Sequence, residues 1–121
     1  MNILLVDDDF FFQMTLSFFL KELNHQTVFA QDGQKALDIL TKNKNFDLVI
    51  CDIDMPVMAG DSFISMLKKF YTDKHPILVI ASGMQNGQEF LKKSNIAYDY
   101  YFKKPLDVNV FSKTLDEIHT R

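Results

Sequence analysis

The sequence predicts an α/β fold in which a parallel β-sheet carries helices on both faces. Short apolar runs alternate with segments of helical periodicity five times along the 121 residues, and such strand–helix repetition favours a parallel sheet. Three of the runs are continuously apolar, as expected for strands that are covered on both faces. The expected strands are 2–6, 26–30, 46–51, 76–81 and 98–102.

The expected helices are recognised by apolar residues that recur every three or four positions and so form a stripe facing the sheet. The segment 10–24 places on its stripe Phe12, Leu16, Phe19 and Leu23. The segment 107–119 places on its stripe Val108, Phe111, Leu115 and Ile118. The other expected helices are 32–43, 61–71 and the shorter 86–94.

Composition and charge indicate one domain, residues 1–121, and narrow the class of partner. Apolar residues make up 47% of the chain and charged residues 24%, which is typical of a globular protein rather than a disordered one. The net charge of −3 gives no long-range attraction to nucleic acid or to an anionic membrane. No apolar run approaches a membrane span, and the single cysteine, Cys51, cannot form an internal disulfide. We therefore expect a cytoplasmic domain that binds neither nucleic acid nor membrane directly.

Chemically unusual residues follow the expected strands, which is where open parallel sheets bind their ligands. If the first and third strands are neighbours, five carboxylates crowd one rim of the sheet. Two like charges about 4 Å apart repel by about 4 kcal/mol at an effective dielectric constant of roughly 20, so the rim needs a cation or protonated acids. The residues after the first, third, fourth and fifth strands are Asp7, Asp8, Asp9, Asp52, Asp54, Ser82 and Lys104.

These residues predict a magnesium site that is used in phosphoryl transfer. Carboxylate oxygens without histidine or cysteine favour a hard cation, and Mg²⁺ is preferred over Ca²⁺ because the spacing of an EF-hand is absent. Asp52 is the candidate nucleophile, which would form an aspartyl-phosphate. Lys104 and the cation would neutralise charge on the transferring phosphoryl group. Ser82 would donate a hydrogen bond to that group after transfer.

Four sequence blocks lie just after or across the expected strands: ILLVDDD (3–9), DLVICDIDMPVMAG (47–60), ILVIASG (77–83) and DYYFKKP (99–105). Together, and across the whole chain, they resemble the receiver domain of two-component response regulators, including chemotaxis regulators. The resemblance implies a flavodoxin-like, doubly wound fold with a five-stranded parallel sheet of strand order 2-1-3-4-5 and five helices. It also implies that the chain is a phosphoacceptor in a phosphorelay and not an enzyme. Its own catalysis would be limited to self-phosphorylation and self-dephosphorylation at Asp52.

The resemblance implies a role for each matched residue at the rim. Asp52 would accept the phosphoryl group, and Lys104 would sense it. Asp8 would bind Mg²⁺ directly, while Asp7 would help through a water molecule. Asp52 and the backbone carbonyl of Asp54 would complete the set of protein ligands.

Ser82 and Tyr101 match the positions of the family's switch pair. The resemblance implies that the Ser82 hydroxyl engages the phosphoryl group and that the ring of Tyr101 then moves inward. The change would reach the face built from the fourth helix, the last strand and the fifth helix, where partner binding is switched. The bond between Lys104 and Pro105 is a candidate for a cis peptide, which is common at this place in the family.

A second apolar strip on the first expected helix, formed by Phe11, Met14 and Phe18, falls to one side of the stripe that faces the sheet. We call it the docking strip. Two interpretations remain open: the strip packs beneath the last helix or a loop, or it is an exposed binding surface. The resemblance implies that a histidine kinase or a histidine phosphotransfer protein docks on the first helix, and exposed Phe and Met suit contact with a partner helix.

The sequence is compatible with more than one downstream partner and with other classes of function. The output is a downstream protein target or an output domain absent from this chain, and a homodimer is compatible with both. A different class of function is a phosphohydrolase similar to haloacid dehalogenases, because DIDM (52–55) contains the two acids of that family's motif, Asp52 and Asp54. That motif normally follows the first strand, whereas here it follows the third. A receiver-like module that binds partners without phosphorylation is disfavoured by the complete set of reactive groups.

Overall fold

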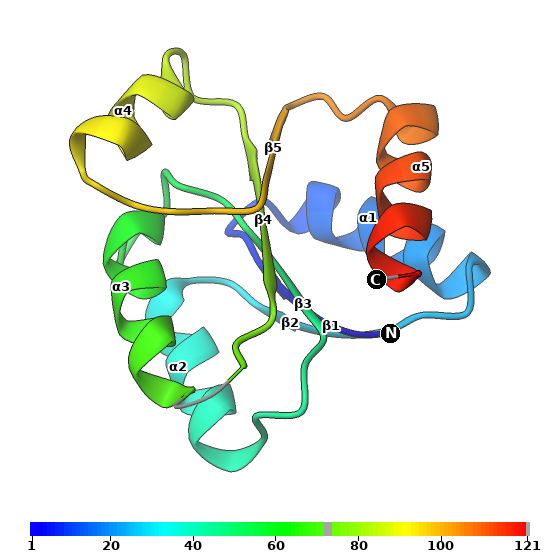
Figure 1. Cartoon of the computed structure of the whole chain (residues 1–121), viewed down its shortest axis with the longest axis horizontal. Helices are drawn as coiled ribbons and strands as arrows, with labels where there is room; N and C mark the ends of the chain where they lie inside the picture. The colour runs from blue at the N-terminus through cyan, green and yellow to red at the C-terminus, as the bar shows by residue number, and fades with distance from the viewer. Residues whose placement is uncertain (72–73, 121) are drawn as a thin grey trace.

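A sheet of five parallel strands forms the centre of the molecule (Figure 1). The computed structural model describes residues 1–71 and 74–120. The strands are β1 (Asn2–Val6), β2 (Gln26–Ala30), β3 (Leu48–Cys51), β4 (Ile77–Ser82) and β5 (Tyr100–Lys103). Their order across the sheet is β2-β1-β3-β4-β5, and every neighbouring pair is parallel. The expected fold class and strand order are therefore confirmed.

Helices cover both faces of this sheet. They are α1 (Phe10–Glu22), α2 (Gly33–Lys42), α3 (Gly60–Phe70), α4 (Gly87–Lys93) and α5 (Val108–His119). In Figure 1, α1 and α5 lie on one side of the sheet, and α2 and α3 lie on the other. Three helices begin after an aspartate whose carboxylate accepts a backbone N–H of the first turn, namely Asp9, Asp32 and Asp107. No helix in the described ranges has the length and apolar character needed to cross a membrane.

Apolar side chains form one core layer on each face of the sheet. Successive residues of β1 alternate between the layers, since Leu4 packs in the layer of α2 and α3, whereas Ile3 and Leu5 pack in the layer of α1 and α5. Every residue of β3 is buried, as expected of a strand that is covered on both faces. Full burial of one such side chain contributes roughly 1.5–3 kcal/mol. The central strands therefore hold firmly the strand ends that carry the polar residues.

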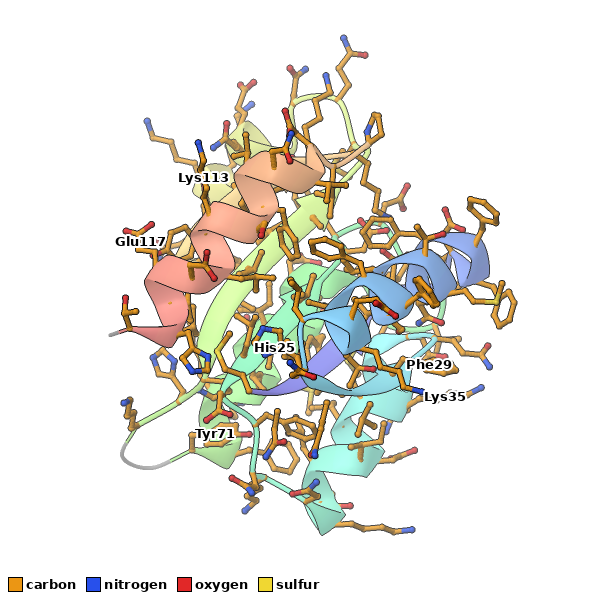
Figure 2. The ribbon with its side chains drawn as sticks, turned by 90° about the vertical axis from the view of Figure 1, so that its right-hand side faces the viewer. His25, Phe29, Lys35, Tyr71, Lys113 and Glu117 are labelled. Carbon is orange, nitrogen blue, oxygen red and sulfur yellow. The ribbon has the colours of Figure 1, made fainter. Side chains whose placement is uncertain are left out.

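Two residues that were predicted to face the sheet do not. Leu23 is 39% exposed because it caps the C-terminal end of α1, where the chain turns toward β2, and Leu20 is fully buried in its place. Val108 is 54% exposed because it is the first residue of α5, and the buried stripe of this helix begins at Phe111. The edge strand β2 has a neighbour on one side only, and its Phe29 side chain is exposed (Figure 2).

Candidate functional site

The carboxyl ends of the strands converge at one edge of the sheet and carry its polar residues. Asp52 follows β3, and its N–H donates to the carbonyl of Val6 at 3.0 Å, which extends the pairing of β1 and β3 up to the acid itself. Lys104 follows β5, and its N–H donates to the carbonyl of Ser82, the last residue of β4, at 2.9 Å. The sheet backbone therefore brings Asp7, directly after β1, close to a lysine 97 positions later.

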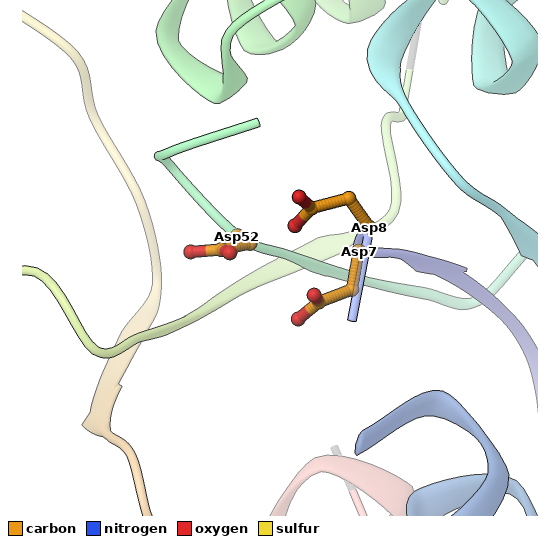
Figure 3. Close-up of side chains that lie close together, drawn as sticks. All are labelled: Asp7, Asp8 and Asp52. Carbon is orange, nitrogen blue, oxygen red and sulfur yellow. The ribbon is translucent and has the colours of Figure 1, made fainter. Parts of the chain in front are cut away.

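Three carboxylates form a cluster at this edge (Figure 3). Carboxylate oxygens of Asp7, Asp8 and Asp52 all lie within 4.8 Å of one another. Asp7 and Asp52 are only 1% and 7% exposed, whereas Asp8 is open to solvent. An all-oxygen set with one solvent-facing member suits a hard divalent cation that keeps several of its waters. The expected crowding of these three acids is confirmed.

Asp9 and Asp54 lie outside this cluster, although the sequence placed them at the same rim. The Asp9 carboxylate accepts the N–H of Phe12 at 3.1 Å and caps α1. The side chain of Asp54 is exposed. Three of the five carboxylates expected at the rim therefore meet, because the other two serve a helix end or face the solvent.

The ammonium group of Lys104 lies between the two buried acids. Its Nζ is 2.6 Å from Asp7 Oδ2 and 3.6 Å from Asp52 Oδ2. It also lies 4.1 Å from the centroid of the Phe12 ring. The neighbouring Lys103 is exposed, so Lys104 is the member of the pair that enters the site. The peptide bond between Lys104 and Pro105 is cis, as the resemblance implies.

Burial dominates the electrostatics of both acids. Loss of contact with water raises the pKa of Asp7, and the hydrogen bond from Lys104 opposes that rise. Burial also raises the pKa of Asp52, opposed first by the charge of Lys104 and then by hydrogen bonds to its carboxylate. One of these comes from the N–H of Ile53 and occupies Asp52 Oδ1 at 2.7 Å. One ammonium therefore does not fully compensate two buried carboxylates, and an added cation would be bound favourably.

Ser82 and Tyr101 lie beside the buried acids. Ser82 is fully buried, and its Oγ accepts the N–H of Met84 at 3.0 Å. Burial raises the pKa of the Tyr101 hydroxyl, and a hydrogen bond with Ser82 opposes that rise. The same hydroxyl packs against Gly87, where an added Cβ would overlap the Tyr101 oxygen. Tyr101 therefore points inward, and the space that its hydroxyl occupies exists because residue 87 has no side chain.

Replacing Gly87 by alanine is expected to push the Tyr101 ring outward, because the new methyl group would overlap the tyrosine hydroxyl. Burial is the main cause of the raised pKa of Tyr101, so exposure should return that pKa toward its ordinary value of about 10. An NMR titration of isotope-labelled tyrosine measures the change. Gly83→Ala is the matched control, since a Cβ there meets only the Lys104 Cβ, at 3.9 Å. A Tyr101 pKa that stays raised in Gly87→Ala would contradict this account of the packing.

The docking strip is uncovered, since Phe11, Met14 and Phe18 are 75%, 56% and 68% exposed. The interpretation that it packs beneath the last helix or a loop is therefore wrong. Beside it, an apolar groove of about 450 Å³ lies between α1 and α5. Phe11 belongs to both features, and Lys104 and Pro105 line the end of the groove that is nearest the acids. The strip and the groove thus form one apolar surface next to the site.

Sequence reasoning did not single out Gln13, which is buried within α1. Its side-chain Nε2 donates to the carbonyls of Asp7, at 2.5 Å, and Ala30, at 2.9 Å. These bonds tie α1 to the ends of β1 and β2 and so hold the backbone that presents the acids. In the sequence, the feature that could have pointed to this role is a lone polar residue within the apolar run FFFQM (10–14).

A family model described as the response regulator receiver domain matches residues 3–116. The chain is 36% identical to the transcriptional regulatory protein ZraR of Klebsiella oxytoca over 99% of its own length, but it spans only 27% of that protein. It is 28% identical to the gliding motility regulatory protein of Myxococcus xanthus and spans 15% of it. By contrast, a chemotaxis protein CheY homolog of Campylobacter jejuni is 29% identical, with 98% of this chain and 92% of that protein covered.

Solved structures show the same fold. A two-component response regulator from Clostridium difficile has a TM-score of 0.87 at 22% identity, with 99% of this chain and 96% of that chain covered. The response regulator protein TrrA from Thermotoga maritima, solved in complex with Mg(2+)-BeF, has a TM-score of 0.80 at 23% identity, with 97% of this chain covered. At these identities the likeness establishes the architecture and nothing finer.

Proposed function

The chain belongs to the response regulator receiver domain family, and on that basis we propose that Asp52 accepts a phosphoryl group from a phosphohistidine donor. One observation carries the proposal: the Asp52 carboxylate lies 3.6 Å from the Lys104 ammonium and within 4.8 Å of two further carboxylates. A candidate nucleophile, a cation for the phosphoryl oxygens and acids that can hold a metal are thus in one place.

In the proposed step, Asp52 Oδ2 attacks the phosphorus of the phosphohistidine. The bond between phosphorus and the imidazole nitrogen breaks, its electron pair returns to the imidazole, and an acyl phosphate forms on Asp52. Oδ2 is the better candidate because Oδ1 accepts the N–H of Ile53, whereas Oδ2 faces Lys104. Lys104 would stabilise the charge that develops on the phosphoryl oxygens, and Ser82 would donate a hydrogen bond to one of them.

The carboxylates of Asp7, Asp8 and Asp52 fit a hard divalent cation, and we expect Mg²⁺ there with the backbone carbonyl of Asp54 as a further ligand. When bound, Mg²⁺ supplies positive charge that offsets the charge of the acids and of the phosphoryl group. The exposed Asp8 is the acid most accessible to the ion.

Asp7 has less freedom to bind a cation directly. Its Oδ2 accepts from Lys104 at 2.6 Å, and its Oδ1 accepts the N–H of Asp9 at 2.9 Å. Each oxygen therefore already has a protein partner, which supports a contact to the cation through water rather than a direct bond.

The phosphohydrolase alternative needs the Asp54 carboxylate as an acid next to Asp52. That side chain is exposed and stands outside the acidic cluster found among the described residues. The geometry therefore favours the phosphoacceptor, and no observation favours the hydrolase.

The donor is proposed to be a histidine kinase or a histidine phosphotransfer protein that docks on the strip formed by Phe11, Met14 and Phe18. The strip is exposed, and the groove beside it ends at Lys104. A helix laid on this surface would bury apolar area and bring a phosphohistidine to the rim of the sheet.

Phe18→Asp is expected to slow phosphotransfer from the cognate donor by at least tenfold, because a charge in a buried apolar contact costs more than about 1.4 kcal/mol. Labelling by phosphoramidate, which needs no docking, should be unchanged. Val110→Asp is the control, since Val110 is also an exposed apolar residue but lies on α5, outside the docking strip. Equal slowing with both phosphoryl donors would refute a docking role for the strip.

The output is proposed to run through Ser82 and Tyr101 to the face formed by α4, β5 and α5. The Tyr101 hydroxyl points inward against Gly87, and a phosphoryl group on Asp52 would raise the population of this inward ring position over an outward one. The Tyr101 ring also lies 5.9 Å from that of Tyr98, centroid to centroid, which connects the switch to the surface. The partner that responds to this switch is a downstream protein, an output domain or a second copy of the chain.

Phosphorus NMR after incubation with phosphoramidate and Mg²⁺ tests the proposed function. The expected result is one acyl-phosphate resonance for the wild-type protein. Asp54→Asn should give the same resonance, because it removes a nearby carboxylate but keeps Asp52. In a second incubation, with a phosphate monoester in place of phosphoramidate, release of inorganic phosphate without a protein-bound resonance would support the hydrolase instead.

A further inference from the structure

We propose that Phe12 is a positioning residue for Lys104, and that its ring holds the lysine ammonium between Asp7 and Asp52. The inference rests on the proposed function, because it concerns the lysine that would neutralise the phosphoryl group. The resemblance gives no role of this kind to residue 12, and the sequence pattern predicts only a core residue there.

The ammonium of Lys104 has three N–H donors and three partners in different places. Asp7 Oδ2 is 2.6 Å away, Asp52 Oδ2 is 3.6 Å away, and the centroid of the Phe12 ring is 4.1 Å away. The last distance is well inside the reach of about 6 Å for attraction between a cation and an aromatic face. Only 17% of the lysine side chain is exposed, so the ring takes a position that water would otherwise fill.

The ring also constrains a flexible side chain. Lysine has a flexible four-carbon stem, and rotation about its bonds must be restricted for the ammonium to stay in one place. The carboxylates attract the ammonium from the side of the sheet, and Phe12 contacts it from α1, so the group is held from two elements. An aliphatic side chain at residue 12 would fill space but offer the cation no attractive face.

Phe12 contacts a cation, whereas Phe19, the other half-buried aromatic residue of α1, contacts another aromatic ring. Phe19 also lines the groove, but its ring packs against Phe111, with 6.3 Å between centroids. In the described part of the chain, the cation–aromatic contacts are those of Lys104 with Phe12 and of Lys44 with Phe70. Phe19 therefore provides a matched control for the loss of an aromatic ring from α1.

Two readouts test the proposal in the full chain, with Phe12→Leu, Phe12→Tyr and Phe19→Leu as variants. With phosphoramidate and saturating Mg²⁺, Phe12→Leu is expected to be phosphorylated about threefold to tenfold more slowly than wild type. Phe12→Tyr, which keeps the aromatic face, and Phe19→Leu should stay close to the wild-type rate. Urea denaturation identifies any variant whose loss of rate reflects unfolding.

The second readout is the NMR shift of the Lys104 ε-methylene protons without any phosphoryl donor. The Phe12 ring current should displace these protons in wild type and in Phe12→Tyr, and the displacement should disappear in Phe12→Leu. Unchanged proton shifts in Phe12→Leu, or equal slowing in Phe12→Leu and Phe19→Leu, would overturn the proposal. If the wild-type protein accepts no phosphoryl group, the proposed function fails, while the proton shifts still decide whether Phe12 positions Lys104.

Discussion

Replacing Asp52 by asparagine is expected to abolish phosphorylation and, at the same time, to make the metal-free protein more stable at neutral pH. Burial of the Asp52 carboxylate outweighs the charge of Lys104 and the hydrogen bonds that favour the ionised form, so its pKa is raised. The ionised side chain is therefore less favourable in the folded chain than in the unfolded chain. A neutral amide of the same shape removes this cost, and we expect a gain of about 1 kcal/mol in the free energy of unfolding.

The pH dependence of that gain has a definite sign. The pKa of Asp52 in the folded chain lies above the ordinary value of 3.8. Below the ordinary pKa the side chain is protonated in both states, and its full contribution to folding stability is present. That contribution is lost as the pH rises through the raised pKa, because the side chain then ionises in the folded chain. Wild type and Asp52→Asn should therefore be similar in stability near about pH 4 and diverge toward neutral pH. Urea denaturation in EDTA at several pH values measures the difference. A wild-type protein that is more stable than Asp52→Asn at neutral pH would contradict the prediction.

Mg²⁺ is expected to stabilise the wild-type protein at neutral pH, because a ligand that binds only the folded state adds to the free energy of unfolding. At a concentration one hundred times its dissociation constant, the gain is about 2.7 kcal/mol. The gain should shrink toward about pH 4. Protons then compete with the ion for the carboxylates of Asp7 and Asp52, because burial raises the pKa of both groups.

Asp8→Asn is the sharpest control for the metal, because it leaves both buried acids and Lys104 in place. It should lose most of the stabilisation by Mg²⁺, since Asp8 is the exposed member of the carboxylate cluster. Thermal unfolding with and without Mg²⁺ gives the comparison. If Mg²⁺ shifted wild type and Asp8→Asn equally, the ion would not be bound at this cluster.

The architecture was predictable because its signals are local. Continuous apolar runs identify the central strands, and β3 is buried at every residue as predicted. The placement of Asp7, Asp52 and Lys104 at one edge follows from the rule that parallel strands end together. The Asp cluster was thus predictable as soon as β1 and β3 were taken as neighbours, which the register confirms.

Features that depend on how elements pack were not predictable from periodicity. A helical stripe does not tell where a helix ends relative to the sheet, so Leu23 and Val108 were wrongly placed in the core. Gln13 appeared as an interruption of an apolar run, and its role emerges only when the ends of β1 and β2 meet it. The contact of Tyr101 with Gly87 likewise depends on the fold, since it joins β5 to the start of α4.

Intact-mass spectrometry after treatment with phosphoramidate tests the central claim most directly. Wild-type protein with Mg²⁺ should gain the mass of one phosphoryl group, whereas wild type in EDTA and Asp52→Asn with Mg²⁺ should gain none. A phosphorylated Asp52→Asn protein, or a wild-type protein that stays unmodified with Mg²⁺ present, would contradict the assignment of Asp52 as the phosphoacceptor beside a cation site.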